Sequence, residues 1–147
     1  MYKHILIPTD GSTQSAHAVA QGVELAKATG ARVTGLFVAP APTPLVFDGL
    51  MPVGYMQPDE HAALSASAAA RYLGAIEKAA SQAGVAFEGL TVTGEFPAQA
   101  ILDAAAKHKC DLIVMASHGR RGLAGVLLGS ETQKVLTHAK LPVLVCR

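Results

Sequence analysis

Short apolar runs alternate with longer helix-forming stretches along most of this 147-residue chain. Runs such as Ile5–Ile7 and Leu112–Met115 are uniformly apolar, which is typical of strands buried on both faces. Between these runs, apolar residues recur on one helical face, as Val19, Val23 and Ala26 do. Because strands alternate with helices, the sequence predicts an α/β fold with a parallel sheet and helices on both faces.

The pattern predicts five strands and four helices. The strands are expected at residues 5–7, 32–38, 87–93, 111–115 and 141–146. The helices are expected at residues 13–29, 59–84, 97–109 and 130–138, and Gly30 is expected to end the first of them. The 87–93 strand alternates polar and apolar residues, so we expect it nearer an edge of the sheet. The second helix is expected to place on its apolar face Leu64, Ala68, Tyr72, Ala75 and Ala79.

Composition argues against several classes of protein. Half of the residues are hydrophobic, and the length suits one compact domain, so we expect residues 1–147 to form a single domain. The net charge of +1 gives no general attraction to nucleic acid or to an acidic membrane. Cys110 and Cys146 form no C-x-x-C pair, and no two histidines are four residues apart, which argues against a structural metal site. Reduced thiols and the lack of a long apolar segment fit a cytoplasmic location.

The segment Pro40–Pro58 stands out because it carries five prolines and several large apolar residues. Its prolines exclude a regular helix or a central strand. Long irregular segments in compact domains are often lids or interaction surfaces. Two interpretations stay open: a variable connection folded on the surface, or a segment that contacts a ligand or a partner.

Residues 116–130 join an expected strand to an expected helix and contain four glycines, at 119, 122, 125 and 129. Glycine lets the backbone approach a phosphate, and a helix N-terminus presents unpaired N–H groups with a favourable dipole. The loop matches neither the P-loop pattern nor the dinucleotide fingerprint. It is interpreted either as a phosphate-binding loop or as a loop that needs flexible turns. His118, Arg120 and Arg121 suit phosphate contacts in the first case, and structural or solvated positions in the second.

Two further polar features have more than one interpretation. Asp10 follows the first strand, so its carboxylate suits a ribose hydroxyl or Mg²⁺, or else an Asx turn or the cap of the first helix. The run Ser130-Glu131-Thr132-Gln133 has the pattern of a capping box, in which Ser130 could both cap the helix and touch a phosphate. Glu131 would repel a phosphate unless it points away or meets a metal ion.

The carboxyl ends of parallel strands meet at one edge of a sheet, and ligands bind there at the point where the strand order reverses. Asp10, Val38, the 40–58 segment and the 116–129 loop all follow such ends, so we expect them to converge. No acid–base pair beside a nucleophile and no triad spacing can be identified. The sequence therefore indicates a binding protein more than an enzyme.

Four segments, in order along the chain, resemble the universal stress protein family. They are residues 5–12 (ILIPTDGS), 111–119 (DLIVMASHG), 127–130 (LLGS) and 141–145 (LPVLV). The resemblance implies a Rossmann-like, adenine-nucleotide-α-hydrolase-like sandwich whose five-stranded parallel sheet has the order 3-2-1-4-5. It also implies a homodimer, often built through the C-terminal strands.

Members of this family that bind ATP carry the pattern G-x₂-G-x₉-G-[ST]. Gly119, Gly129 and Ser130 match this pattern, whereas Ala116 stands at its first glycine. By resemblance, Asp10 would meet the ribose, Val38 would bond the adenine through its backbone, and Mg²⁺ or Mn²⁺ would accompany the phosphates. The nucleotide-binding set that the resemblance implies is Pro8, Thr9, Asp10, Val38, Met115, Ala116, Ser117, His118, Gly119, Arg120, Gly129, Ser130, Glu131 and Thr132.

The expected function is that of a cytoplasmic, nucleotide-responsive stress protein that binds ATP with Mg²⁺ and signals to an unidentified protein partner. Nucleotide binding would order the Pro40–Pro58 segment. Two alternatives stay open. One is a dimeric interaction module that binds no nucleotide, which Ala116 favours because its methyl group is a real obstacle where φ is positive. The other is a slow ATPase or nucleotidyl transferase in which Asp10 holds the metal ion.

Overall fold

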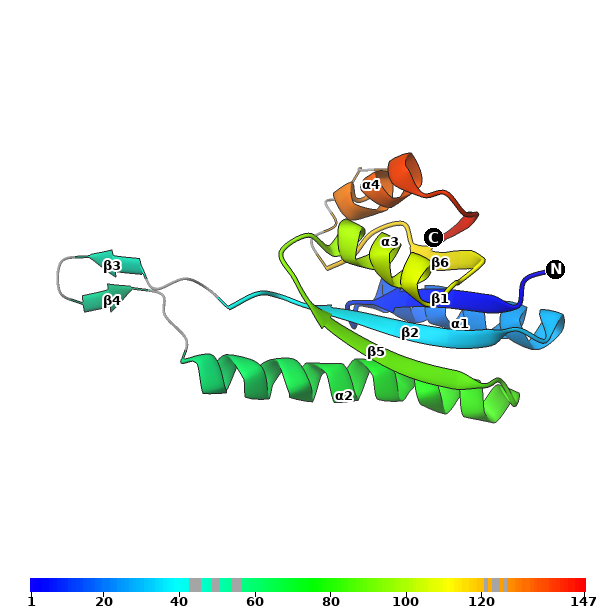
Figure 1. The fold of residues 1–147 in the computed structure, drawn as a ribbon, viewed down its shortest axis with the longest axis horizontal. Helices are drawn as coiled ribbons and strands as arrows, with labels where there is room; N and C mark the ends of the chain where they lie inside the picture. Colours follow the sequence, from blue (N-terminus) through cyan, green and yellow to red (C-terminus); the bar gives the residue numbers. More distant parts are fainter. Residues whose placement is uncertain (43–45, 49–50, 54–56, 121, 123–124, 126) are drawn as a thin grey trace.

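The computed structural model describes residues 1–42, 46–48, 51–53, 57–120, 122, 125 and 127–147. Its helices and strands follow one another as the alternating pattern predicts (Figure 1). The elements are β1 (His4–Thr9), α1 (Thr13–Thr29), β2 (Arg32–Ala39), β3 (Val46–Asp48), β4 (Met51–Val53), α2 (Pro58–Ala83), β5 (Phe87–Thr93), α3 (Pro97–Lys107), β6 (Leu112–Ala116), α4 (Ser130–His138) and β7 (Val143–Cys146). The predicted boundaries of the five main strands and four helices agree with these to within two residues.

Five strands form one parallel sheet in the order β5-β2-β1-β6-β7. The register pairs His4 with Arg32 between β1 and β2, and Ile5 with Leu112 between β1 and β6. Counting only these five strands along the chain, the order is 3-2-1-4-5, which confirms the predicted topology. β5 lies at one edge, as its alternating pattern predicts. The strand order reverses between β1 and β6, and this is the place where such sheets bind ligands.

Helices cover both faces of the sheet: α1 and α2 lie on one face, and α3 and α4 lie on the other (Figure 1). Successive residues of a strand point to opposite faces. Ile5 and Ile7 therefore pack in the cluster that holds Ile76 of α2, while Leu6 packs in the cluster that holds Val135 of α4. All of these side chains are fully buried. Burial of each such side chain stabilises the fold by about 1.5–3 kcal/mol.

The predicted apolar face of α2 is confirmed for Ala68, Tyr72 and Ala79, which are half-buried and pack against the core clusters, but not for Leu64 and Ala75. Leu64 is 58% exposed and Ala75 is exposed, whereas the residues that α2 buries are Ala69, Ile76 and Ala80. The helix is so rich in alanine that apolar residues occur all around it. Its sequence pattern therefore distinguishes the buried face from the exposed face only weakly. In addition, the N-terminal end of α2 runs past the sheet (Figure 1). Leu64, in the N-terminal part of α2, belongs to none of the core clusters.

The Pro40–Pro58 segment contains a short ladder of its own. β3 pairs antiparallel with β4, and this pair is separate from the main sheet. The described residues of the segment supply no strand to the main sheet, in line with its prolines, and Pro58 is the first residue of α2. Residues 43–45, 49–50 and 54–56 lie outside the described residues, so the predicted lid or interaction surface stays a prediction.

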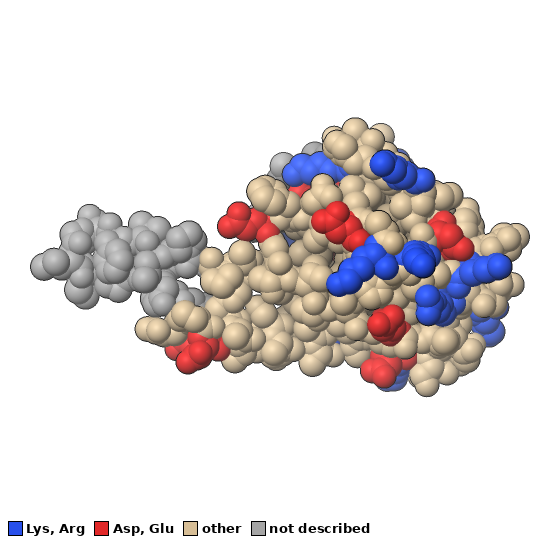
Figure 2. Space-filling model, viewed as in Figure 1, with Lys and Arg blue, Asp and Glu red and all other residues tan. Residues whose placement is uncertain are grey.

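Two further observations bear on the surface. Lys and Arg are interspersed with Asp and Glu over the face that Figure 2 shows. Within the described ranges, no helix combines the length and the apolarity that crossing a bilayer requires.

Candidate functional site

The loop after β1 and the loop after β6 meet at the carboxyl edge of the sheet, on either side of the switch point. Asp10 joins them, because its Oδ2 accepts a hydrogen bond from the backbone N–H of Arg120 at 2.8 Å. The two residues are 110 positions apart in the sequence. The predicted convergence of Asp10 with the glycine-rich loop is therefore confirmed.

Asp10 is held by its own turn as well. Its Oδ1 accepts from the backbone N–H of Ser12 and from the Ser15 hydroxyl, both at 3.0 Å. The Asx turn is thus confirmed, while the helix cap belongs to Ser12, whose hydroxyl accepts from the Ser15 N–H. Burial alone would raise the pKa of Asp10, but the hydrogen bonds from Ser12, Arg120 and Ser15 outweigh it and lower that pKa. Asp10 is therefore a fixed carboxylate at neutral pH.

At three of the loop glycines, Gly119, Gly122 and Gly129, a Cβ atom would come unusually close to neighbouring atoms. A Cβ atom on Gly119 would lie 2.5 Å from Oδ2 of Asp10. A Cβ atom on Gly129 would lie 3.2 Å from the carbonyl oxygen of Ser117, which already accepts from the Gly129 N–H at 2.7 Å. The glycines thus allow the backbone to fold closely around Asp10 and Ser117.

The capping box predicted at the start of α4 is wrong. Gly129 is the N-cap, and Ser130 is already the first helical residue. The Gln133 side chain donates to the carbonyl of Leu128 at 3.1 Å instead of reaching back to Ser130. The first backbone bond of the helix runs from the Gln133 N–H to the Gly129 carbonyl. The N–H groups of residues 130–132 precede that bond, and such groups form an anion site at a helix start.

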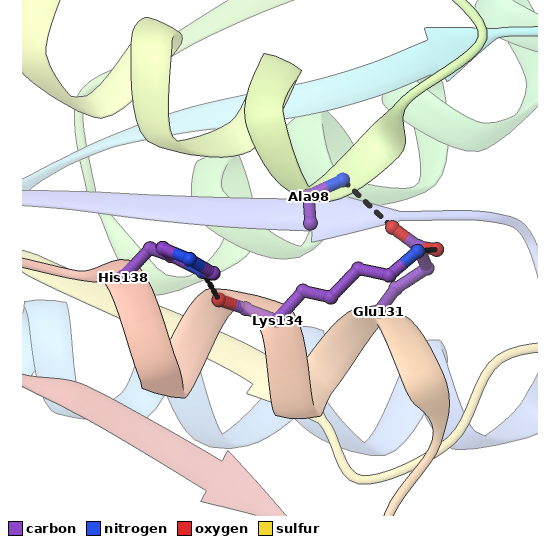
Figure 3. A network of polar contacts seen from close by, with 4 residues as sticks. All are labelled: Ala98, Glu131, Lys134 and His138. Atoms are coloured by element: carbon purple, nitrogen blue, oxygen red, sulfur yellow. Dashed lines mark hydrogen bonds and ion pairs between the residues drawn. The ribbon is translucent and has the colours of Figure 1, made fainter.

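Glu131 and Thr132 use their side chains for contacts within the fold (Figure 3 shows Glu131). Glu131 accepts from the Ala98 N–H in the first turn of α3 at 2.9 Å and pairs with Lys134 at 3.0 Å. Thr132 is buried, and its hydroxyl donates to the Ala116 carbonyl at 3.0 Å. Any contact of these two residues with a phosphate therefore depends on their backbone N–H groups.

Arg120 stacks its guanidinium on Tyr72, which lies on α2. Its Cζ lies 5.2 Å from the ring centroid, and its Nη2 donates to the Tyr72 hydroxyl. Tyr72 also packs edge-on against Phe37 at the end of β2, with ring centroids 5.4 Å apart. The sequence indicates Tyr72 only as an apolar residue of α2, because nothing local reveals a contact spanning 48 positions. Tyr72 is the residue at this edge that sequence reasoning misses.

Ala116 is the last residue of β6, opposite Cys146. It is buried and belongs to the core cluster on the α1 face. Among the described residues, Lys109 is the only non-glycine residue with a positive φ, so the backbone at Ala116 does not require glycine. Pro8 and Val38 are half-buried at the neighbouring strand ends, and Thr9 and Met115 are buried there. Each strand-end residue of the predicted set thus lies at the carboxyl edge.

The other loop residues are partly described. Ser117 is buried, with its N–H donating to the Cys146 carbonyl, and its hydroxyl lies 3.0 Å from Nδ1 of His118. Arg121 lies outside the described residues. No three His, Cys, Asp or Glu side chains within the described ranges are grouped so that they could hold a metal ion.

Burial raises the pKa of the Cys110 thiol to about 11.

A groove of about 650 Å³ runs between α1 and α2 and reaches Thr9, Gly11 and Arg120 at one end. Of the predicted nucleotide-binding residues, only Thr9 and Arg120 line it. Most of the groove therefore lies apart from the candidate site.

Fold and site together define a class: an open, parallel α/β sandwich with a glycine-lined helix start and a fixed carboxylate at its switch point. A model of the universal stress protein family matches residues 1–147. The chain belongs to this family. A universal stress protein of Methanocaldococcus jannaschii is 35% identical over 147 residues, which cover 100% of this chain and 83% of the relative.

Solved structures of universal stress proteins have the same fold as this chain. The universal stress protein UspA from Lactobacillus plantarum matches with a TM-score of 0.79 and 27% identity, over 99% of this chain and 98% of the other. A universal stress protein solved in complex with cAMP matches with a TM-score of 0.69 and 26% identity, over 99% of this chain and 97% of the other.

Proposed function

We propose that this universal stress protein binds ATP at the carboxyl edge of the sheet. The observation that carries the proposal is the bond from the Arg120 N–H to Asp10, which holds the glycine-rich loop against the turn after β1. The phosphates would lie against the loop backbone and the first N–H groups of α4. The ribose would meet Asp10, and the adenine would lie beside Pro8 and Val38.

Asp10 retains capacity for a ribose hydroxyl. A carboxylate offers about four acceptor positions. Three of these are used by Ser12, Ser15 and Arg120. The remaining position accepts one further donor, which a ribose hydroxyl supplies.

The same count bears on the metal ion. Mg²⁺ keeps several waters and is usually bound by substrate phosphates with one or two carboxylates. Asp10 is largely occupied, so we expect Mg²⁺ or Mn²⁺ to be held mainly by the phosphates. An ATPase that depends on a metal ion held by Asp10 gains no support from this arrangement.

An adenine nucleotide fits the comparison with known proteins. The relative whose structure was solved with cAMP shares the fold over nearly the whole chain. Its ligand contains adenine, ribose and a phosphate, which are the parts that the edge residues here are proposed to bind. This likeness supports the nucleotide class, and the loop length and helix start extend the proposal to a triphosphate.

The proposal includes a signalling role in the cytoplasm as a homodimer. β7 is the last strand of the sheet, and Leu144 on it is 40% exposed. A strand edge with an exposed apolar side chain suits pairing with a second copy. We propose that nucleotide occupancy changes what the dimer presents to a protein partner.

Mass spectrometry of the nucleotide released from purified, denatured protein tests the proposal. We expect ATP in an amount that approaches the amount of protein. A Gly119→Ala variant purified in parallel is expected to release much less. Protein that carries no nucleotide and shows no thermal shift with millimolar ATP would favour a dimeric interaction module without a nucleotide.

A further inference from the structure

The groove between α1 and α2 stays open because small side chains line both walls. Ala16 and Ala20 lie one helical turn apart on α1, and Ala75 and Ala79 lie one turn apart on α2. A methyl group is too short to close the gap between the two helices. The volume of about 650 Å³ lies within the range of small-molecule sites.

The deeper lining of the groove is apolar. Val19 is 9% exposed and Ile76 is fully buried, and both contribute to it. An alkyl chain laid along the groove would cover mainly the alanine methyl groups, because Ile76 exposes no surface, and would gain about 25 cal/mol for each Å² of apolar surface removed from water.

One end of the groove is cationic. Arg71 and Arg120 both line that end, and their Cζ atoms lie 5.1 and 5.2 Å from the centroid of the Tyr72 ring. Both guanidiniums donate to the Tyr72 hydroxyl. A guanidinium has five N–H donors, so each of them can make further bonds.

Among the described residues, no carboxylate pairs with the guanidinium of either arginine. The ion pairs within the described part of the chain are Glu88 with His108 and Glu131 with Lys134, so neither arginine has a carboxylate oxygen within 4.0 Å there. Asp10 bonds the backbone of Arg120 and not its guanidinium. Two adjacent guanidiniums favour an anionic group, and a carboxylate matches their planar donors.

We propose that this groove binds a medium-chain fatty acid, with its carboxylate at Arg71 and Arg120 and its alkyl chain between α1 and α2. The lining residues of α2 run from Arg71 to Ala79, which is about 12 Å of helix. An extended medium-chain acyl group has a similar length. The site is distinct from the proposed nucleotide site, although Thr9 and Arg120 border both.

Calorimetric titration with decanoate below its micelle concentration tests the proposal. Saturable binding to the wild-type protein is expected, with little or none for decyltrimethylammonium, which has the same chain and the opposite charge. Arg71→Gln is expected to weaken decanoate binding about tenfold, because it removes one charged partner of the carboxylate. Equal affinity for the two amphiphiles, or no heat with decanoate, would overturn the proposal.

A second pair of variants tests the position of the chain. Ala79→Phe fills the groove and is expected to abolish decanoate binding, while Ala70→Phe, at an exposed position of α2 outside the groove, is expected to retain it. Circular dichroism checks that both variants fold. ATP titration of Ala79→Phe is expected to match the wild type, which separates a failure of this site from a failure of the nucleotide site. Decanoate binding that survives Ala79→Phe would refute the placement.

Discussion

Gly119 shows how one residue type holds the candidate site together. A methyl group at this position would press on Oδ2 of Asp10, and that carboxylate cannot swing away freely because three hydrogen bonds hold it. We expect Gly119→Ala to lower the free energy of unfolding by about 1–2 kcal/mol and to weaken ATP binding by about tenfold or more. Thermal unfolding and calorimetric titration measure the two effects.

Gly94→Ala is the matched control, because a Cβ atom there meets nothing within 4 Å. Its stability and ATP affinity are expected to equal those of the wild type. Equal ATP affinity in Gly119→Ala and Gly94→Ala would show that the close approach to Asp10 is unimportant for binding.

Ala116 stands at the first glycine of the ATP-binding pattern that the sequence resembles, yet it lies in a regular strand with its methyl group in the core. We therefore expect Ala116→Gly to leave ATP affinity unchanged. The substitution is expected to destabilise the protein by about 0.5–1 kcal/mol, because glycine weakens a strand. Calorimetry and urea unfolding check both values, and a clear gain in ATP affinity would show that the methyl group obstructs the site.

At the scale of elements, Glu131 links α4 to α3. Its carboxylate accepts from the Ala98 N–H in the first turn of α3, where the helix dipole favours negative charge (Figure 3). Glu131→Ala is expected to lower stability by about 1–2 kcal/mol. Lys134→Ala removes only the exposed ion pair with Glu131, so its effect is expected to stay below about 0.5 kcal/mol. Urea unfolding measures the free energy of unfolding of the two variants. Equal decreases in Glu131→Ala and Lys134→Ala would refute the role of the bond from the Ala98 N–H to Glu131.

The elements also show what local sequence can and cannot predict. Uniformly apolar strands and Gly30 are local signals, and the structure confirms them. The exact apolar face of α2 depends on packing, which its alanine-rich pattern does not resolve, and the cap of α4 lies one residue before Ser130, at Gly129. Tyr72 reaches the loop through tertiary structure alone. The convergence of Asp10 with the loop was predictable because topology places the carboxyl ends of parallel strands together.

At the scale of the whole molecule, stability is expected to fall as the pH is lowered below about 6.5, the ordinary pKa of histidine. Burial, and then the charge of Arg32, lower the pKa of His4, which is only 4% exposed. Below about pH 6.5 His4 is protonated in the unfolded chain but stays neutral in the folded chain. The contribution of neutral His4 to the free energy of unfolding is therefore lost as the pH falls. Asp10 and Asp111 have lowered pKa values too, from hydrogen bonds that outweigh burial, and they add a loss below about pH 4.

Urea unfolding between about pH 7.5 and pH 5 measures the histidine effect. His4→Gln is expected to flatten the curve in this range, even though it loses the bond between His4 Nε2 and the Thr34 hydroxyl. A wild-type curve that is flat from pH 7.5 to pH 5, or a variant curve with the same slope as the wild type, would contradict the assignment to His4.

The central claim is that the carboxyl edge of the sheet, with Asp10 and the loop before α4, binds ATP. Calorimetric titration of nucleotide-free protein with ATP and Mg²⁺ tests it most directly, with Gly119→Ala titrated in parallel. The account predicts saturable binding at a single site on each chain of the wild type and greatly weakened binding of the variant. No heat at millimolar ATP for the wild type, or equal binding by both proteins, would contradict it.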